Sequence, residues 1–147
     1  MQIAQKLYQG IEIEGETIGL ITYMRTDGTN LSKDAILAFR DYIKKEIGAD
    51  YLPGSALNYS GKKAKNAQEA HEAIRPTDII RTPQSVKKYL SPDQNKLYDL
   101  VWSRALSSQM ESAKFDRNTI TIASDNNDTI CKSSGSVLKF DGFLKIY

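Results

Sequence analysis

Residues 19–32 of the chain read GLITYMRTDGTNLS. The short apolar run ends at Tyr23, and the residues after it are polar and favour turns. We expect the apolar run to be a short extended segment, and Ser32 to be the N-cap of the next helix. Extended backbone places residues i and i+2 on the same side, so Tyr23 and Arg25 are expected to face one ligand.

The pair Tyr23 and Arg25 is a candidate for phosphoryl chemistry. A phenol can attack phosphorus, and a guanidinium can hold the phosphate that is attacked. A free phenol has a pKa of about 10, so Tyr23 needs a nearby positive charge or a base, and Arg25 can supply the charge. The competing interpretation is a half-buried tyrosine whose hydroxyl is simply hydrogen-bonded.

A second candidate stretch, residues 68–76, reads QEAHEAIRP. His71 is the only histidine in the chain, and together with Arg75 it could contact a phosphate. The stretch begins like a zinc-protease helix, but Arg75 stands where the second histidine ligand would be. We therefore expect no metal site here. The alternative is an exposed histidine beside a capping arginine.

Composition limits the class of protein. The chain has 147 residues, 40% of them hydrophobic, and a net charge of +2, which fits one domain or one domain with part of a second. It contains no apolar run of membrane-spanning length and no signal-peptide pattern. The single cysteine, Cys131, excludes an internal disulfide, fits a reducing cytoplasm and is expected to be an inert strand residue. Phosphate-binding glycine loops and the serine-hydrolase motif are absent from the sequence.

Positive charge is concentrated in one part of the chain. Residues 59–88 contain seven basic and three acidic side chains. This local surplus favours a nucleic-acid backbone nearby, although a solvated lysine-rich loop is the competing interpretation. The candidate DNA-binding residues are Lys62, Lys63, Lys65 and Arg75.

The first 112 residues are expected to be mainly helical. Two adjacent helices joined by a tight turn, 83–89 and 92–110, resemble a helix-turn-helix DNA-binding unit. The inner stripe of the second helix is expected to be Leu97, Leu100, Val101 and Ala105, with Tyr98 and Trp102 as a second stripe. The remaining expected elements are a helix over 1–9, a hairpin or extended loop over 11–18, a helix over 33–47 and a loop over 50–66.

The pattern changes near residue 112. Alternating and β-branched residues predict strands over 118–123, 130–131 and 137–140. The predicted fold class is therefore α+β. A mainly helical helix-turn-helix (CAP-like) unit spans 1–112, and a short antiparallel β segment spans 113–147.

Together these stretches resemble one known family. Residues 19–27 and 30–32 resemble the active-site tyrosine motif of bacterial DNA topoisomerase I, a type IA topoisomerase, and residues 68–76 resemble its second signature. Residues 96–98, 113–116 and 140–142 extend the similarity over nearly the whole chain. Met24 stands where topoisomerase III usually has proline. Gly28 replaces the serine of many members, and we expect little consequence.

The resemblance implies a DNA isomerase that relaxes negative supercoils. Tyr23 would be the nucleophile that forms a 5′-phosphotyrosyl intermediate, Arg25 would steady the scissile phosphate, and His71 would contact that phosphate. The basic loop would follow a single DNA strand. Arg75 would position the loop or the DNA backbone.

The resemblance also implies parts that this sequence lacks. Family members bind Mg²⁺ in an N-terminal toprim domain, which has no match here, and the β segment would belong to the arch domain. We therefore expect an internal fragment, monomeric and inactive alone, of a cytoplasmic, nucleoid-associated bacterial enzyme. The alternatives are a non-catalytic helix-turn-helix module that binds duplex DNA and a structural domain that binds a protein partner.

Overall fold

Helix α4, Pro92–Ser107, is the element against which α1 and α3 pack. In the computed structural model, which describes residues 1–59, 71–125 and 128–147, α4 begins at a capping box. The Ser91 hydroxyl accepts a hydrogen bond from the Gln94 backbone N–H, and the Gln94 side chain accepts one from the Ser91 N–H. Pro92 occupies the first turn, where it removes no helical hydrogen bond.

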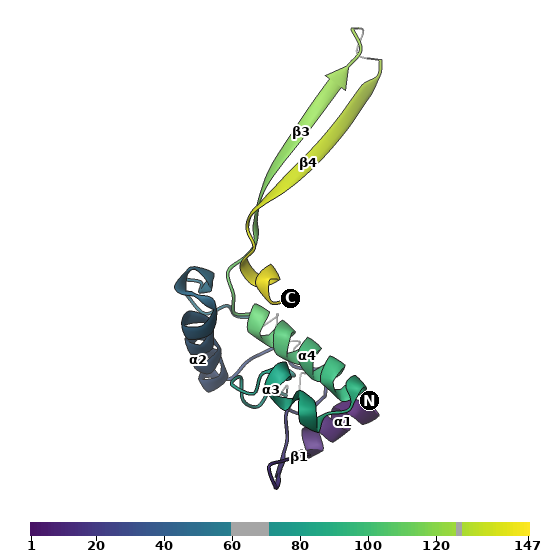
Figure 1. The fold of residues 1–147 in the computed structure, drawn as a ribbon. Coiled ribbons are helices and arrows are strands. Elements are labelled where there is room, and N and C mark those ends of the chain that lie inside the picture. The colour runs from purple at the N-terminus through teal and green to yellow at the C-terminus, as the bar shows by residue number, and fades with distance from the viewer. Residues whose placement is uncertain (60–70, 126–127) are drawn as a thin grey trace, which may run out of the picture.

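The fold is mixed α+β, as predicted, with four α-helices and two antiparallel two-stranded sheets among the described residues. Figure 1 shows the helices gathered into one body, from which a long hairpin projects. The elements are α1 (Gln2–Gln9), β1 (Ile11–Ile13), β2 (Glu16–Ile18), α2 (Lys33–Tyr42), a π-helical turn (Ile43–Ile47), a 3₁₀ turn (Ala49–Tyr51), α3 (Pro83–Val86), a 3₁₀ turn (Lys87–Tyr89), α4, β3 (Lys114–Ala123), β4 (Ile130–Phe140) and a last 3₁₀ turn (Gly142–Lys145).

The aromatic residues of α4 form the centre of the core. Tyr98 is fully buried, and its hydroxyl donates to the Arg81 carbonyl at 2.6 Å. Trp102 donates its ring N–H to the Ile79 carbonyl at 3.0 Å. Burial raises the pKa of Tyr98, so its hydroxyl stays a neutral donor. These bonds fix the segment before α3 onto α4.

One part of the predicted inner stripe is wrong. Leu100 is 56% exposed, whereas the buried face of α4 is formed by Tyr98, Trp102, Ala105 and Leu106. At about 100° per residue, Leu100 lies about 200° around the helix from Tyr98 and therefore points away from the core. The helix ends at Ser107 and not near residue 110, and beyond it both ends of the Gln109 side-chain amide pair with the backbone of Leu57.

The C-terminal hairpin differs from the prediction in two respects. Strand β3 begins at Lys114, four residues before the predicted start at residue 118. Residues 130–140 form one continuous strand, β4, rather than two short ones, and Gly135 pairs with Asn118 in the middle of the hairpin. Residues Lys132–Ser136 are polar and show no strand pattern, so they were not predicted to be part of a strand. This hairpin is exposed on both faces, so its strands need no alternation of apolar and polar residues. Cys131 lies on β4 and is exposed.

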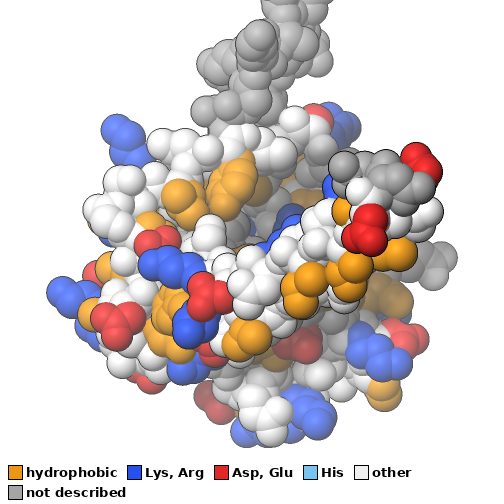
Figure 2. Space-filling view, turned by 90° about the horizontal axis from the view of Figure 1, so that it is seen from above, with side chains coloured by type: hydrophobic (Ala, Val, Ile, Leu, Met, Phe, Trp, Pro, Cys, Tyr) orange, Lys and Arg blue, Asp and Glu red, His pale blue; other side chains and the backbone are white. Residues whose placement is uncertain are grey.

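The hairpin carries apolar side chains that the helical body does not cover. Figure 2, viewed from above, shows hydrophobic side chains along the projecting strands. Two strands alone are marginally stable in water, so packing against further residues would stabilise them. The exposed apolar residues are Phe115, Ile120, Ile122, Ile130, Val137 and Leu138.

After the hairpin the chain returns to the helical body. The Phe143 N–H donates to the Glu111 carbonyl at 2.9 Å, and the Phe143 ring packs against the core. Gly142 makes this return possible: its φ is +51°, and a Cβ there would lie 2.5 Å from the Glu111 carbonyl oxygen. The domain boundary near residue 112 stays a prediction. In the described ranges, no helix has the length and apolar character needed to cross a bilayer.

Candidate active site

Tyr23 lies at the end of an extended segment that is held on both sides. The Leu20 N–H donates to the Leu7 carbonyl at 2.8 Å, and the Thr22 N–H donates to the Arg75 carbonyl at 2.9 Å. Leu20 and its neighbour Ile21 are buried. The backbone that delivers Tyr23 to the surface is therefore fixed between α1 and the segment that follows His71.

Thr22 strengthens this attachment through its side chain. Its hydroxyl donates to the Ala73 carbonyl at 2.8 Å and accepts from the Arg75 N–H at 3.0 Å. An isolated antiparallel bridge joins Ile21 to Pro76. The two motifs found in the sequence are thus neighbours in the fold, although about 50 residues separate them.

The three residues predicted to be catalytic come together at the surface. The ring centroids of Tyr23 and His71 are 5.2 Å apart, and the guanidinium carbon of Arg25 lies 5.8 Å from the Tyr23 ring centroid. The Tyr23 side chain is exposed, as its contact with a phosphate would require. A hollow of about 400 Å³ is lined by Tyr8, Gly19, Ile21, Thr22, Tyr23, His71, Glu72 and Thr77.

Asp27 orients His71. His71 Nδ1 lies 3.2 Å from both carboxylate oxygens of Asp27. A neutral imidazole that donates from Nδ1 presents Nε2 as an acceptor, and a protonated imidazole presents a second N–H. Asp27 therefore leaves Nε2 of His71 available to a ligand in either charge state.

Glu72 and Arg75 form an ion pair that supports this site. The Glu72 carboxylate accepts from Arg75 Nε at 2.7 Å and Nη2 at 3.0 Å, and from the Ser32 N–H at 2.9 Å. Burial opposes ionisation of Glu72, but the bonds from Arg75 and Ser32 outweigh it and lower the Glu72 pKa. Arg75 also donates to the Pro76 carbonyl, and its side chain is only 15% exposed. Direct DNA contact by Arg75 stays a prediction.

Replacing Glu72 by glutamine is expected to destabilise the chain at pH 7 by about 1–2 kcal/mol, because Arg75 loses its charged partner. Because the pKa of Glu72 is lower in the folded chain, its carboxylate stabilises the fold at pH values above its unfolded-state pKa, about 4.5. This stabilisation is lost as the pH falls through the folded-state pKa of Glu72. The difference in the free energy of unfolding between the wild type and Glu72→Gln should therefore become smaller below about pH 4.5. Denaturant unfolding at several pH values measures it. Exposed Glu16→Gln is the control, and an equal loss there would contradict the assignment.

Gly28 has a structural consequence that we did not expect. A Cβ at this position would collide with the backbone carbonyl of His71. A serine here would require the loop and the His71 segment to move apart. The glycine thus permits the close approach that brings Asp27 to His71.

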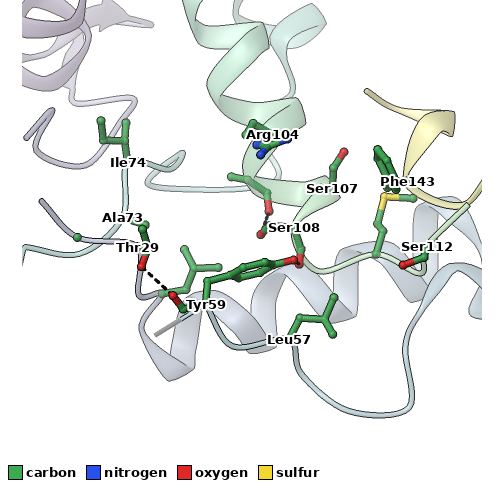
Figure 3. A pocket seen from close by; sticks show the side chains of 14 residues that line it. Thr29, Leu57, Tyr59, Ala73, Ile74, Arg104, Ser107, Ser108, Ser112 and Phe143 are labelled. Atoms are coloured by element: carbon green, nitrogen blue, oxygen red, sulfur yellow. Dashed lines mark hydrogen bonds between the residues drawn. The ribbon is translucent and has the colours of Figure 1, made fainter. Parts of the chain in front are cut away.

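A cavity of about 440 Å³ lies behind the loop that follows Tyr23. Figure 3 shows Thr29 and Ile74 on one side of it, Phe143 on the other and Arg104 of α4 between them. The Thr29 hydroxyl donates to the Tyr59 carbonyl, and the Tyr59 hydroxyl donates to the Ser108 carbonyl, both at 2.9 Å. These bonds tie the loop after the nucleophile candidate to the end of α4.

Several predicted residues lie outside what the structure describes. Lys62, Lys63 and Lys65 belong to residues 60–70, so their proposed DNA contacts stay predictions. Within the described part of the chain, no group of three or more histidine, cysteine, aspartate or glutamate side chains is placed to hold a metal ion. The Mg²⁺ site that the family resemblance implies belongs, by that resemblance, to a toprim domain outside these residues, and it stays a prediction.

Two residues that contact the candidate site were not found by sequence reasoning. Tyr8 contacts the ring of Tyr23, with a centroid distance of 5.3 Å. Asp27 was not assigned a role from the sequence. Tyr8 gave no usable signal because it lies 15 positions before Tyr23, on an amphipathic helix. Asp27 could have been noticed as a carboxylate four residues after Tyr23.

Comparison with known proteins gives a consistent result over the whole chain. Residues 1–147 match the family model described as DNA topoisomerase. "DNA topoisomerase 1" of Rickettsia felis is 54% identical over all of this chain and 19% of its own length. "DNA topoisomerase 1" of Helicobacter pylori is 49% identical over 99% of this chain and 19% of its own length.

A solved structure agrees with these sequence matches. Full-length topoisomerase I from Thermotoga maritima superimposes with a TM-score of 0.82 at 36% identity, over 99% of this chain and 22% of that one. The chain thus spans about one fifth of the length of the relatives it matches.

Proposed function

Because the chain belongs to the bacterial DNA topoisomerase I family, of type IA, we propose that it carries the nucleophile of such an enzyme. The observation that supports this most directly is that Arg25 and His71 both lie beside the Tyr23 ring, and that Tyr23 and His71 line one surface hollow. The substrate is DNA, cleaved in one strand. The product is DNA of altered topology, with negative supercoils relaxed after strand passage.

The proposed reaction is a transesterification. The Tyr23 oxygen bonds to phosphorus while the bond from phosphorus to the 3′ oxygen breaks. The phenolic proton is lost, and a proton ends on the released 3′ hydroxyl. One phosphodiester replaces another, so the 5′-phosphotyrosyl link retains the energy for religation and no ATP is needed. Arg25 stabilises negative charge on the phosphate and on the phenolate, and His71 in its protonated form donates from Nε2 to a phosphate oxygen.

The remaining parts of the enzyme are assigned by resemblance. Mg²⁺ would be held by a toprim domain outside these residues. The basic loop containing Lys62, Lys63 and Lys65 would follow a single strand, with Arg75 positioning it. The enzyme would act as a monomer in the bacterial cytoplasm.

We also propose a division of the chain into two units. Residues 1–112 would form the tyrosine domain, and 113–147 would belong to the arch. Within the first unit, α3 and α4 would be the helix-turn-helix pair, supported by the short connection between them and by their packing. The buried aromatic face of α4 serves the core, which favours a structural role for the pair over base reading in duplex DNA.

Mapping the covalent adduct tests the proposal. The full-length enzyme that contains this chain would be trapped on an oligonucleotide with denaturant, then digested and analysed by mass spectrometry. We expect a nucleotide joined through its 5′ phosphate to the peptide containing Tyr23. An adduct on another residue, or one joined through a 3′ phosphate, would contradict the proposal.

The isolated 147-residue chain is expected to show no relaxation activity of its own. The acidic groups that would assist the leaving 3′ oxygen lie, by resemblance, in the toprim domain. Gel assays of supercoiled plasmid measure this, with the full-length enzyme as the positive control. Relaxation by the chain alone would show that the toprim domain is dispensable.

A further inference from the structure

The nucleophile candidate is in contact with two other rings. Tyr8 and Tyr23 have a centroid distance of 5.3 Å and an interplanar angle of 60°, and Tyr23 and His71 have 5.2 Å and 51°. Tilted pairs at these distances are favourable arrangements of aromatic rings. Both Tyr8 and Tyr23 line the hollow described above.

The position of Tyr8 is fixed by the backbone that leads to Tyr23. Tyr8 lies in the last turn of α1, and its neighbour Leu7 is fully buried in the core. The Leu7 carbonyl accepts the hydrogen bond from Leu20, three residues before Tyr23. A Cβ at Gly19 would lie 2.6 Å from the Tyr8 carbonyl oxygen, so glycine is needed for this approach. The end of α1 is therefore attached directly to the segment that carries the nucleophile.

We propose that Tyr8 is a positioning residue for Tyr23, an inference that rests on the proposed function. Tyr23 is 38% exposed, so much of its ring has no protein neighbour to restrict rotation about χ1. The Tyr8 ring restricts that rotation and holds the phenolic oxygen on the side where Arg25 and His71 meet a phosphate. Catalytic rates are sensitive to such placement, since a 1 Å displacement can cost about 10²-fold.

The alternative role for an exposed aromatic residue at this place is stacking on a DNA base. A base-stacking residue contributes to DNA affinity, whereas a positioning residue contributes to the rate at saturating DNA. The two roles are therefore separated by measuring affinity and rate independently.

The test uses three variants of the full-length enzyme: Tyr8→Leu, which removes the ring, Tyr8→Phe, which retains it, and Ile3→Ala as a control on the same helix. Ile3 is 36% exposed, close to the 43% of Tyr8. The measurements are the single-turnover rate of adduct formation at saturating single-stranded oligonucleotide and the dissociation constant from fluorescence anisotropy. Thermal unfolding checks that each variant is folded.

We expect Tyr8→Leu to slow adduct formation about tenfold at saturating DNA, with the dissociation constant unchanged within about twofold. Tyr8→Phe and Ile3→Ala should keep the wild-type rate. A wild-type rate for Tyr8→Leu would overturn the inference. Weaker binding with an unchanged saturating rate would also overturn it, in favour of base stacking. A loss in Tyr8→Phe equal to that in Tyr8→Leu would overturn it as well, because the hydroxyl would then be the active group.

Failure of this inference is distinguishable from failure of the proposed function. The proposed function fails if the adduct forms on a residue other than Tyr23. The Tyr8 inference fails when the adduct forms on Tyr23 and its rate is insensitive to the Tyr8 ring.

Discussion

Replacing Tyr23 by phenylalanine in the full-length enzyme is expected to abolish both the covalent DNA adduct and the relaxation of supercoils. The variant lacks only the phenolic oxygen that attacks phosphorus. Without that oxygen no phosphotyrosyl bond can form at this position, so the adduct should fall below detection. The assay is a denaturing gel of labelled oligonucleotide after the reaction is stopped.

The phenylalanine ring retains the contacts of Tyr23 with Tyr8 and His71. The stability of the variant should therefore match that of the wild type, and its dissociation constant for single-stranded DNA should agree within about twofold. Tyr8→Phe is the matched control, because it removes a hydroxyl from the neighbouring ring that contacts Tyr23. This variant should remain active. A persistent adduct in Tyr23→Phe would place the nucleophile elsewhere. A parallel loss of DNA binding would mean that the hydroxyl acts in recognition.

Sequence patterns predicted the helical part of the fold well because its signals are local. Ser32 is an N-cap as expected, and Gly48 ends the helical stretch that begins after Ser32. The face of α4 was harder to predict because leucines occur around the whole helix. Only the tertiary contacts of Tyr98 and Trp102 identify the inner side. The strand β4 was divided in the prediction because Ser and Gly have low strand preference, whereas pairing with β3 determined the result.

The candidate site was predictable where it depends on residues within one motif. Tyr23 and Arg25 are two positions apart, and their proximity follows from extended backbone. His71 was found because it is the only histidine, but its contact with Asp27 depends on how two loops approach each other. The Tyr8 contact and the clearance at Gly28 depend on packing between distant segments, which no local pattern encodes.

Arg25→Ala is expected to lower the rate of adduct formation at saturating DNA by about 10²-fold, roughly 3 kcal/mol of transition-state stabilisation. Arg25 is exposed beside the Tyr23 ring, so its removal leaves no buried group unpaired and should not destabilise the fold. Arg25→Lys retains the positive charge and should recover most of the rate. The single-turnover rate of adduct formation is measured for the wild type, Arg25→Ala and Arg25→Lys.

Arg75→Ala is the informative control for this experiment, because the two arginines have opposite environments. The Arg75 side chain is largely buried and binds the Glu72 carboxylate through two nitrogens, so its loss should lower the free energy of unfolding. Arg25→Ala should instead lower the rate with stability retained. If Arg25→Ala kept the wild-type rate, the charge that steadies the phosphate would have to come from outside the Tyr23 motif. Among the residues that the structure describes, His71 would then be the remaining group that contacts the Tyr23 ring and can carry a positive charge.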